Sequence, residues 1–146
     1  MKIEKIRYNQ YKNAISLIWE VFLDYTAPDY TEKGVETFRN LINDNEVIKS
    51  LDFLCAFEEN KLIGLVATKN KNKHICFFFV KSEFQNKGIG KALWKTLLDT
   101  TTNTIFTVNS SPYAVPIYHK LGFVSTDTEQ EDDGIRFTPM EYVRNI

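Results

Sequence analysis

The stretch from His74 to Leu93 constrains the fold more than any other part of the sequence. It begins with HICFFFV, a nearly continuous apolar run that is typical of a strand buried on both faces of a sheet. A short polar segment with glycines at 88 and 90 follows, and apolar residues then return at helical spacing. A buried strand, a glycine-containing turn and an amphipathic helix in this order predict an α/β domain.

The rest of the chain supplies the other elements of such a domain. We expect strands over 2–7, 51–57, 62–68, 74–80, 105–108, 123–126 and 135–142. We expect helices from about residue 11 and over 31–43, 88–100 and 112–121, with Thr31 as an N-cap, an interruption at Pro28 and a positive φ at Gly122. The length of 146 residues predicts one domain over 1–146.

Composition excludes several classes of protein. The hydrophobic fraction of 43% argues against a disordered chain, and no apolar run is long enough to cross a membrane. The N-terminus lacks the apolar core of a signal peptide, and the two cysteines form no CxxC pair. We therefore expect a reduced, cytoplasmic protein that does not bind membranes.

Charge is distributed unevenly along the chain. The net charge of −1 argues against nucleic-acid binding as a main activity. Lysines dominate between residues 69 and 95, whereas acids dominate over 20–46 and 127–133. These segments are either solvated surfaces or the two sides of a bipolar cleft, and composition leaves both open.

The turn between the apolar run and the next helix is a candidate phosphate site. The first turn of a helix has unpaired N–H groups and the positive end of the dipole, and glycines allow an anion to approach the main chain. A plain tight turn remains the alternative. A Rossmann fingerprint is excluded because Leu93 stands where Gly or Ala is required, and a P-loop because Ala92 follows Gly90-Lys91.

Two segments resemble motifs of one family. The segment Gln85–Gly90 (QNKGIG) resembles the Q/R-x-x-G-x-G/A motif of the GNAT superfamily of acetyl-CoA-dependent N-acetyltransferases. The segment Asn109–Phe123 resembles the later N…A…Y-x-K-x-G-F motif of that superfamily, and the expected element order matches over almost the whole chain. The resemblance implies a mixed, mostly antiparallel sheet of six to seven strands, flanked by about four helices, with a splayed pair of central strands.

The resemblance also implies a cosubstrate and a reaction. Acetyl-CoA is the implied cosubstrate, without a metal, and its pantetheine arm pairs like a strand with the fourth strand. The implied cofactor-binding residues are Phe79, Val80, Gln85, Asn86, Lys87, Gly88, Ile89, Gly90, Lys91 and Asn109. The Val80 N–H matches the donor to the oxyanion, and Tyr118 matches the tyrosine that protonates the leaving thiolate, although a packed helix tyrosine is its alternative.

The general base is less well defined. Strand alternation places His74, Cys76, Phe78 and Val80 on one face, so His74 is a candidate base. Glu20, Asp24 and an ordered water chain are alternatives, and Cys76 is interpreted as a buried structural thiol.

The acceptor follows from the walls that the superfamily uses, its first two helices and its last hairpin. These segments carry acids and aromatic residues here, with Glu20, Asp24 and Tyr25 as the candidate substrate residues, beside Trp19 and Tyr30. An acidic and aromatic wall suits a cationic amine, so we expect a primary amine of a small molecule or peptide as acceptor.

Other properties stay open at this point. A non-catalytic acyl-CoA sensor on the same fold is the alternative function. A nucleic-acid binder is disfavoured because no stacking-aromatic motif accompanies the lysines. The sequence does not distinguish an acetyl group from a longer acyl group, and the aromatic last strand serves either the core or a homodimer edge.

Overall fold

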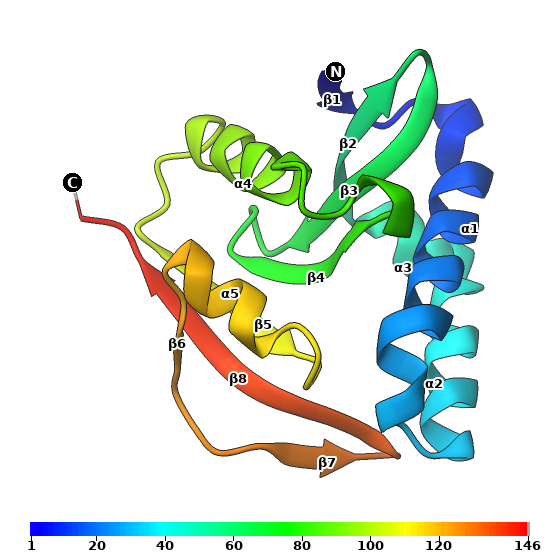
Figure 1. Ribbon diagram of the computed structural model, residues 1–146, viewed down its shortest axis with the longest axis vertical. Helices are drawn as coiled ribbons and strands as arrows, with labels where there is room; N and C mark the ends of the chain where they lie inside the picture. Colours follow the sequence, from blue (N-terminus) through cyan, green and yellow to red (C-terminus); the bar gives the residue numbers. More distant parts are fainter. Residues whose placement is uncertain (146) are drawn as a thin grey trace.

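The computed structural model describes residues 1–145 in three layers (Figure 1), and residue 146, the last of the expected domain, lies outside them. A sheet forms the central layer. One of its faces is covered by α1 (Tyr11–Val21), α2 (Glu32–Ile42) and α3 (Asn45–Ser50), and the other by α4 (Ile89–Asp99) and α5 (Val115–Leu121). The mixed α/β class expected from the sequence is confirmed.

Within residues 1–145 the sheet has eight strands, of which seven follow the order β1-β2-β3-β4-β5-β8-β6 while β7 pairs with β8. Their bounds are β1 (Lys2–Lys5), β2 (Asp52–Glu58), β3 (Lys61–Lys69), β4 (His74–Val80), β5 (Ile105–Ser110), β6 (Val124–Ser125), β7 (Gln130–Asp132) and β8 (Ile135–Val143). The pair β4–β5 is parallel and the other pairs are antiparallel. The strand β7 and the helix α3 were not expected from the sequence.

Local signals explain where several elements begin and end. The Thr31 side chain accepts a hydrogen bond from the Gly34 N–H at 3.2 Å, so the expected N-cap of α2 is confirmed. After α1 the chain passes through a π-helical turn over Phe22–Thr26 and a 3₁₀ turn over Ala27–Asp29, where Pro28 stands. Gly122 has a φ of 106° and ends α5 as expected.

A β-bulge in β4 changes the side-chain pattern of that strand. Ala67 of β3 lies opposite Phe77, but Thr68 lies opposite Ile75, so Cys76 is the extra residue. Cys76 therefore packs, with Phe77 and Phe79, against the core under α1 and α2, whereas Phe78 and Val80 pack under α4 and α5. The expectation that Cys76, Phe78 and Val80 share one face is wrong, because regular alternation does not continue through a bulge.

Beyond the bulge, β4 separates from β5. The two strands pair only as His74 with Thr107 and Ile75 with Val108, near the start of β4. The end of β4 stays paired with β3 alone, where Val80 lies opposite Gly64. The splayed central pair that the family resemblance implied is thus present. The region between the unpaired end of β4 and the unpaired end of β5 is here called the slot.

Candidate active site

The slot exposes main-chain groups from both of its strands. The Lys81 N–H donates to the Ile63 carbonyl at 2.8 Å, so Lys81 and Ile63 form a hydrogen-bonded residue pair between the end of β4 and β3. Since such pairs alternate along an antiparallel ladder, the N–H and C=O groups of Val80 and Phe78 point away from β3 and into the slot. Phe79 directs its main chain toward β3, so the slot-facing neighbour of Val80 is Phe78 and not Phe79, which the family resemblance implied.

The opposite edge of the slot is the end of β5. The Thr107 N–H donates to the Lys73 carbonyl at 2.8 Å, so the main chain of Thr107 faces β4. By the same alternation the main-chain groups of Asn109 face the slot, and Asn109 lies opposite Pro139 of β8, which has no N–H to donate. Both edges of the slot can therefore pair with an extended ligand that carries amide groups.

The loop after β4 presents a series of unused donors. Among residues 1–145, no acceptor lies against the main-chain N–H groups from Asn86 to Lys91, and the first helical bond of α4 runs from Ala92 to the Gly88 carbonyl. Asn86 and Gly88 have φ of 62° and 81°, which turns the chain into the helix. A Cβ at Gly88 would meet no heavy atom within 4 Å, so the space beside these donors is open.

Positive charge supports this loop only in part. Lys81, Lys87 and Lys91 stand at the loop and the first turn of α4, whereas Lys69, Lys71 and Lys73 lie at the other end of β4. The two ends of this strand are about 20 Å apart at ~3.3 Å per residue. The lysine-rich stretch is therefore not one side of a single bipolar cleft.

Tyr118 lies on the α4–α5 side of the slot. Its ring packs edge-on against Phe78, with centroids 6.1 Å apart, and against Phe123 at 5.2 Å. Tyr118 is 6% exposed, and no side chain or main-chain group among residues 1–145 is hydrogen-bonded to its hydroxyl. Burial raises the pKa of Tyr118, so the phenol keeps its proton at neutral pH and can donate it.

His74 lies at the paired end of the slot, on the same side of the sheet as α1 and α2. Its Nδ1 is 2.7 Å from the Thr107 hydroxyl oxygen, which fixes the ring. Burial, with a smaller effect of Lys69, lowers the pKa of His74, so the imidazole is neutral at pH 7. A neutral ring with one anchored nitrogen is the form that can accept a proton.

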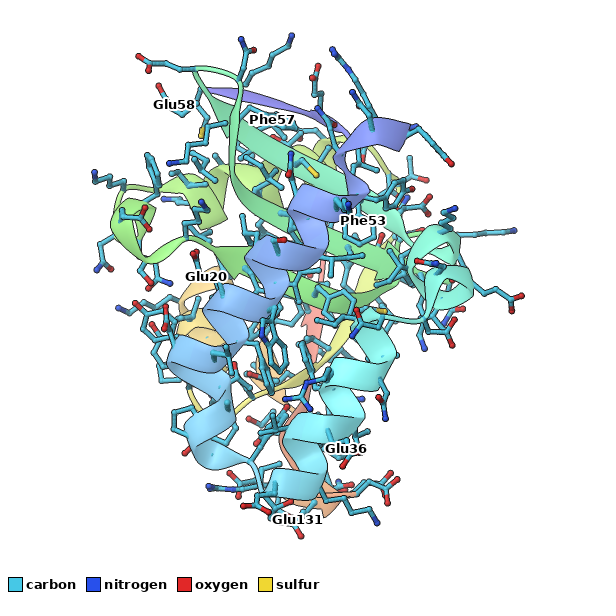
Figure 2. The ribbon with its side chains drawn as sticks, turned by 90° about the vertical axis from the view of Figure 1, so that its right-hand side faces the viewer. Glu20, Glu36, Phe53, Phe57, Glu58 and Glu131 are labelled. Atoms are coloured by element: carbon cyan, nitrogen blue, oxygen red, sulfur yellow. The ribbon has the colours of Figure 1, made fainter. Side chains whose placement is uncertain are left out.

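The expected substrate residues are only partly gathered. Asp24 accepts a hydrogen bond from the Ser82 hydroxyl at 3.2 Å, and Tyr25 stacks on Tyr113 at 4.6 Å, so both reach the open end of the slot. Glu20 stands in the last turn of α1 (Figure 2) and lines a hollow of about 430 Å³ with Lys81. The walls of this hollow include neither Asp24 nor Tyr25. Sequence reasoning missed Tyr113, which has no local signal.

The aromatic wall is partly occupied by the protein's own groups. The Arg39 guanidinium lies over the Trp19 ring at 5.1 Å, and Tyr30 packs on Phe22 at 5.4 Å. Burial, with a smaller effect of Asp29, raises the pKa of Tyr30 to about 12. Of the expected aromatic residues, Tyr25 is thus the one that is positioned at the slot.

The last hairpin closes against the start of α2. The Gly134 carbonyl accepts from the Thr31 N–H at 3.3 Å, and Lys33 pairs with Asp133 at 3.2 Å. Arg136 pairs with Asp29 at 3.6 Å and with Glu129 at 3.1 Å.

Figure 2 shows Glu36 of α2 and Glu131 of β7 at this same end of the molecule. Several acids of the expected wall are therefore neutralised by cross-element ion pairs.

The described residues contain neither a metal-binding cluster nor a membrane-spanning helix. In residues 1–145 no three His, Cys, Asp or Glu side chains lie together as a metal site would need. Over the same range no helix is both long and apolar enough to cross a bilayer.

Comparisons with known proteins agree with this geometry. Residues 26–144 match the family described as "Acetyltransferase (GNAT) domain". The fold is similar to a crystal structure from Rhodopseudomonas palustris described as a GCN5-related N-acetyltransferase, with a TM-score of 0.83 and 18% identity over 98% of this chain and 95% of that one. It is also similar to the PaiA N-acetyltransferase of Thermoplasma acidophilum in complex with coenzyme A, with a TM-score of 0.78 and 22% identity over 99% of this chain and 100% of that one.

Proposed function

The chain belongs to the GNAT family of acetyltransferases and is thus an acyltransferase, and we propose that it transfers the acetyl group of acetyl-CoA to a primary amine of a small molecule or peptide. The observation that carries the proposal is that the slot opens directly beside the loop with unused N–H donors. The complex of the similar PaiA protein with coenzyme A supports the choice of cosubstrate.

The loop and the slot divide the recognition of acetyl-CoA. The N–H groups from Asn86 to Lys91, with the dipole of α4, bind the pyrophosphate, and Lys87 and Lys91 add charge. The slot-facing groups of Phe78 and Asn109 pair with the amides of the pantetheine arm. The Val80 carbonyl already accepts from the Gln85 side chain, so the Val80 N–H is the group that it offers to acetyl-CoA.

The reaction needs an oxyanion donor and an acid. The amine nitrogen attacks the thioester carbonyl, and the slot-facing N–H of Val80 stabilises the negative charge that forms on the oxygen. Tyr118 then gives its proton to sulfur as the C–S bond breaks, so the products are an amide and the CoA thiol.

His74 is the proposed base. It lies on the α1–α2 side at the paired end of the slot, about 20 Å along β4 from Val80 at ~3.3 Å per residue. It therefore takes the proton of the amine through a chain of ordered water and not by direct contact. A His74→Gln variant with unchanged turnover would reassign this role to Asp24, Glu20 or an ordered water.

The acceptor side supports a cationic amine. Asp24 and the exposed faces of Tyr25 and Tyr113 stand at the open end of the slot and supply a carboxylate and aromatic rings. A cytoplasmic location is part of this proposal. Tyr142 of β8 packs on Trp94 at 5.1 Å and thus serves the core and not a homodimer edge.

The deciding experiment measures CoA release from acetyl-CoA with a panel of cationic, neutral and anionic amines. We expect turnover with cationic amines and a strong loss in Tyr118→Phe. Turnover of neutral or anionic amines alone would contradict the acceptor class. Binding of acetyl-CoA without turnover of any amine would favour the alternative function, a non-catalytic acyl-CoA sensor.

A further inference from the structure

Three side chains bridge the open end of the slot, and we call them the clasp: Tyr25, Gln85 and Tyr113. The Gln85 amide Nε2 donates to the Val80 carbonyl at 3.0 Å, and its Oε1 accepts from the Tyr113 hydroxyl at 3.2 Å. The Tyr113 ring stacks on Tyr25, with centroids 4.6 Å apart and planes inclined by 28°.

The clasp joins elements that the main chain leaves apart. Gln85 follows β4, Tyr113 follows β5, and Tyr25 belongs to the π-helical turn after α1. Main-chain pairing of β4 with β5 ends at Ile75 and Val108, so at the far end of β4 side chains make the connection instead. Partial burial and the neighbouring Tyr25 raise the pKa of Tyr113, which keeps its hydroxyl protonated as a donor.

The clasp and the unused N–H donors of the loop after β4 lie toward opposite sides of the sheet. The unused N–H groups lead into α4, on one side of the sheet, whereas Tyr25 lies in the layer of α1 on the other side. A thioester arm that enters from the α4 side would therefore have the clasp at its acceptor side. The three side chains close the slot there without occupying the slot-facing N–H groups of Phe78 and Val80.

We propose that Tyr113 is a positioning residue that closes the slot toward solvent, so that an amine and not water attacks the thioester. This inference rests on the proposed acetyl transfer. If the clasp opens, water attacks the thioester carbonyl, the C–S bond breaks, and the products are acetate and the CoA thiol. The clasp thus controls the ratio of acetyl-CoA hydrolysis to acetyl transfer.

The test compares hydrolysis without amine and transfer with amine in the full chain. In Tyr113→Ala, which lacks the ring and the hydroxyl, we expect the hydrolysis-to-transfer ratio to rise about tenfold or more, with a rise in the rate of hydrolysis without amine, which loss of an amine contact would not cause. In Tyr113→Phe, which keeps the stack and loses one hydrogen bond, we expect a rise of about two- to tenfold. Tyr25→Ala removes the stacking partner and should raise the ratio as well.

Tyr8 offers a matched control because its side chain is 83% exposed and lies outside the clasp. Tyr8→Ala and Tyr8→Phe should leave the ratio unchanged. If Tyr113 has a purely structural role, its substitution lowers the melting temperature and leaves the hydrolysis-to-transfer ratio unchanged, and that result overturns the proposal. If Tyr113→Ala does not fold, Tyr113→Phe still provides this test. A wild-type protein without any acetyl transfer would instead overturn the proposed function, and the clasp with it.

Discussion

The two ends of β4 carry similar charge but are built differently. At its start, the turn over residues 69–73 is lysine-rich and is bonded to its surroundings: the Lys71 carbonyl accepts from the Asn103 side chain at 2.8 Å, and the Thr68 hydroxyl donates to Asn72 at 2.7 Å. At its end, Lys81, Lys87 and Lys91 accompany main-chain donors that have no acceptor among the described residues. Only the second end leads into a helix.

This difference teaches where an anion site comes from. Lysine side chains are mobile and solvated, so their number along the sequence does not place a ligand. Aligned N–H groups at the first turn of a helix point in one direction and carry a partial positive charge. The end of β4 is therefore expected to serve ligand binding, and its start to serve stability.

The largest expected effect comes from an acidic residue in the ligand loop. A Cβ at Gly90 lies 3.8 Å from the Phe78 ring, so Gly90→Asp fits the fold and places a carboxylate beside the pyrophosphate. We expect acetyl-CoA affinity to fall by about 100-fold or more, measured by isothermal titration. Asn70→Asp adds the same charge to the other lysine-rich turn and should not change the affinity. An equal loss of affinity in both variants would show that the net charge of the protein, and not the position of the carboxylate, determines acetyl-CoA binding.

The second effect concerns the acid at the open end. Tyr118→Phe removes the proton donor but keeps the packing on Phe78 and Phe123. We expect kcat to fall by about 100-fold with unchanged acetyl-CoA affinity, measured by steady-state kinetics and titration. An unchanged kcat would assign Tyr118 to the core alone.

A third prediction concerns stability at the start of β4. Asn72→Ala leaves the buried Thr68 hydroxyl without its partner and places alanine at a φ of 67°. We expect the free energy of unfolding to fall by about 1–3 kcal/mol, measured by denaturant titration, with unchanged acetyl-CoA affinity. Asn72→Gly, which relieves the backbone strain, should lose less. A loss of affinity in the folded Asn72→Ala protein would contradict the division between the two ends.

The smallest effect is a pH dependence of stability at His74. Burial lowers the pKa of His74 in the folded state below its ordinary value of 6.5. As pH falls through this region the unfolded chain takes up a proton more readily than the folded one, so the free energy of unfolding decreases. We expect His74→Gln to show a shallower decrease between pH 7 and 5 in thermal unfolding. Parallel profiles would mean that other groups cause the decrease.

The fold was predictable where its signals are local. The bounds of β4 follow from one apolar run, and the start of α2 follows from the Thr31 cap. The strand β7 was missed because its three residues are exposed acids, and α3 because it has only six residues.

The site was predictable in composition but not in geometry. The glycine motif locates the ligand loop, yet the exchange of Phe79 for Phe78 at the slot depends on the register between β3 and β4. The clasp joins Gln85 to Tyr113 across 28 positions, and such a contact leaves no periodic pattern. The roles of Tyr118, His74 and Asn109 in the reaction stay predictions.

The bulge at Cys76 has a consequence for how such a slot arises. The pairing of β4 with β5 stops at Ile75, directly before Cys76, the residue by which β4 exceeds its partner β3 at the bulge. Because a bulge depends on the number of residues and not on the side chain, we expect most substitutions at Cys76 to keep it, and deletion of Cys76 to remove it. The side-chain pattern beyond the bulge, with Phe78 and Val80 under α4 and α5, would change with it, so the length of β4 matters here more than the identity of residue 76.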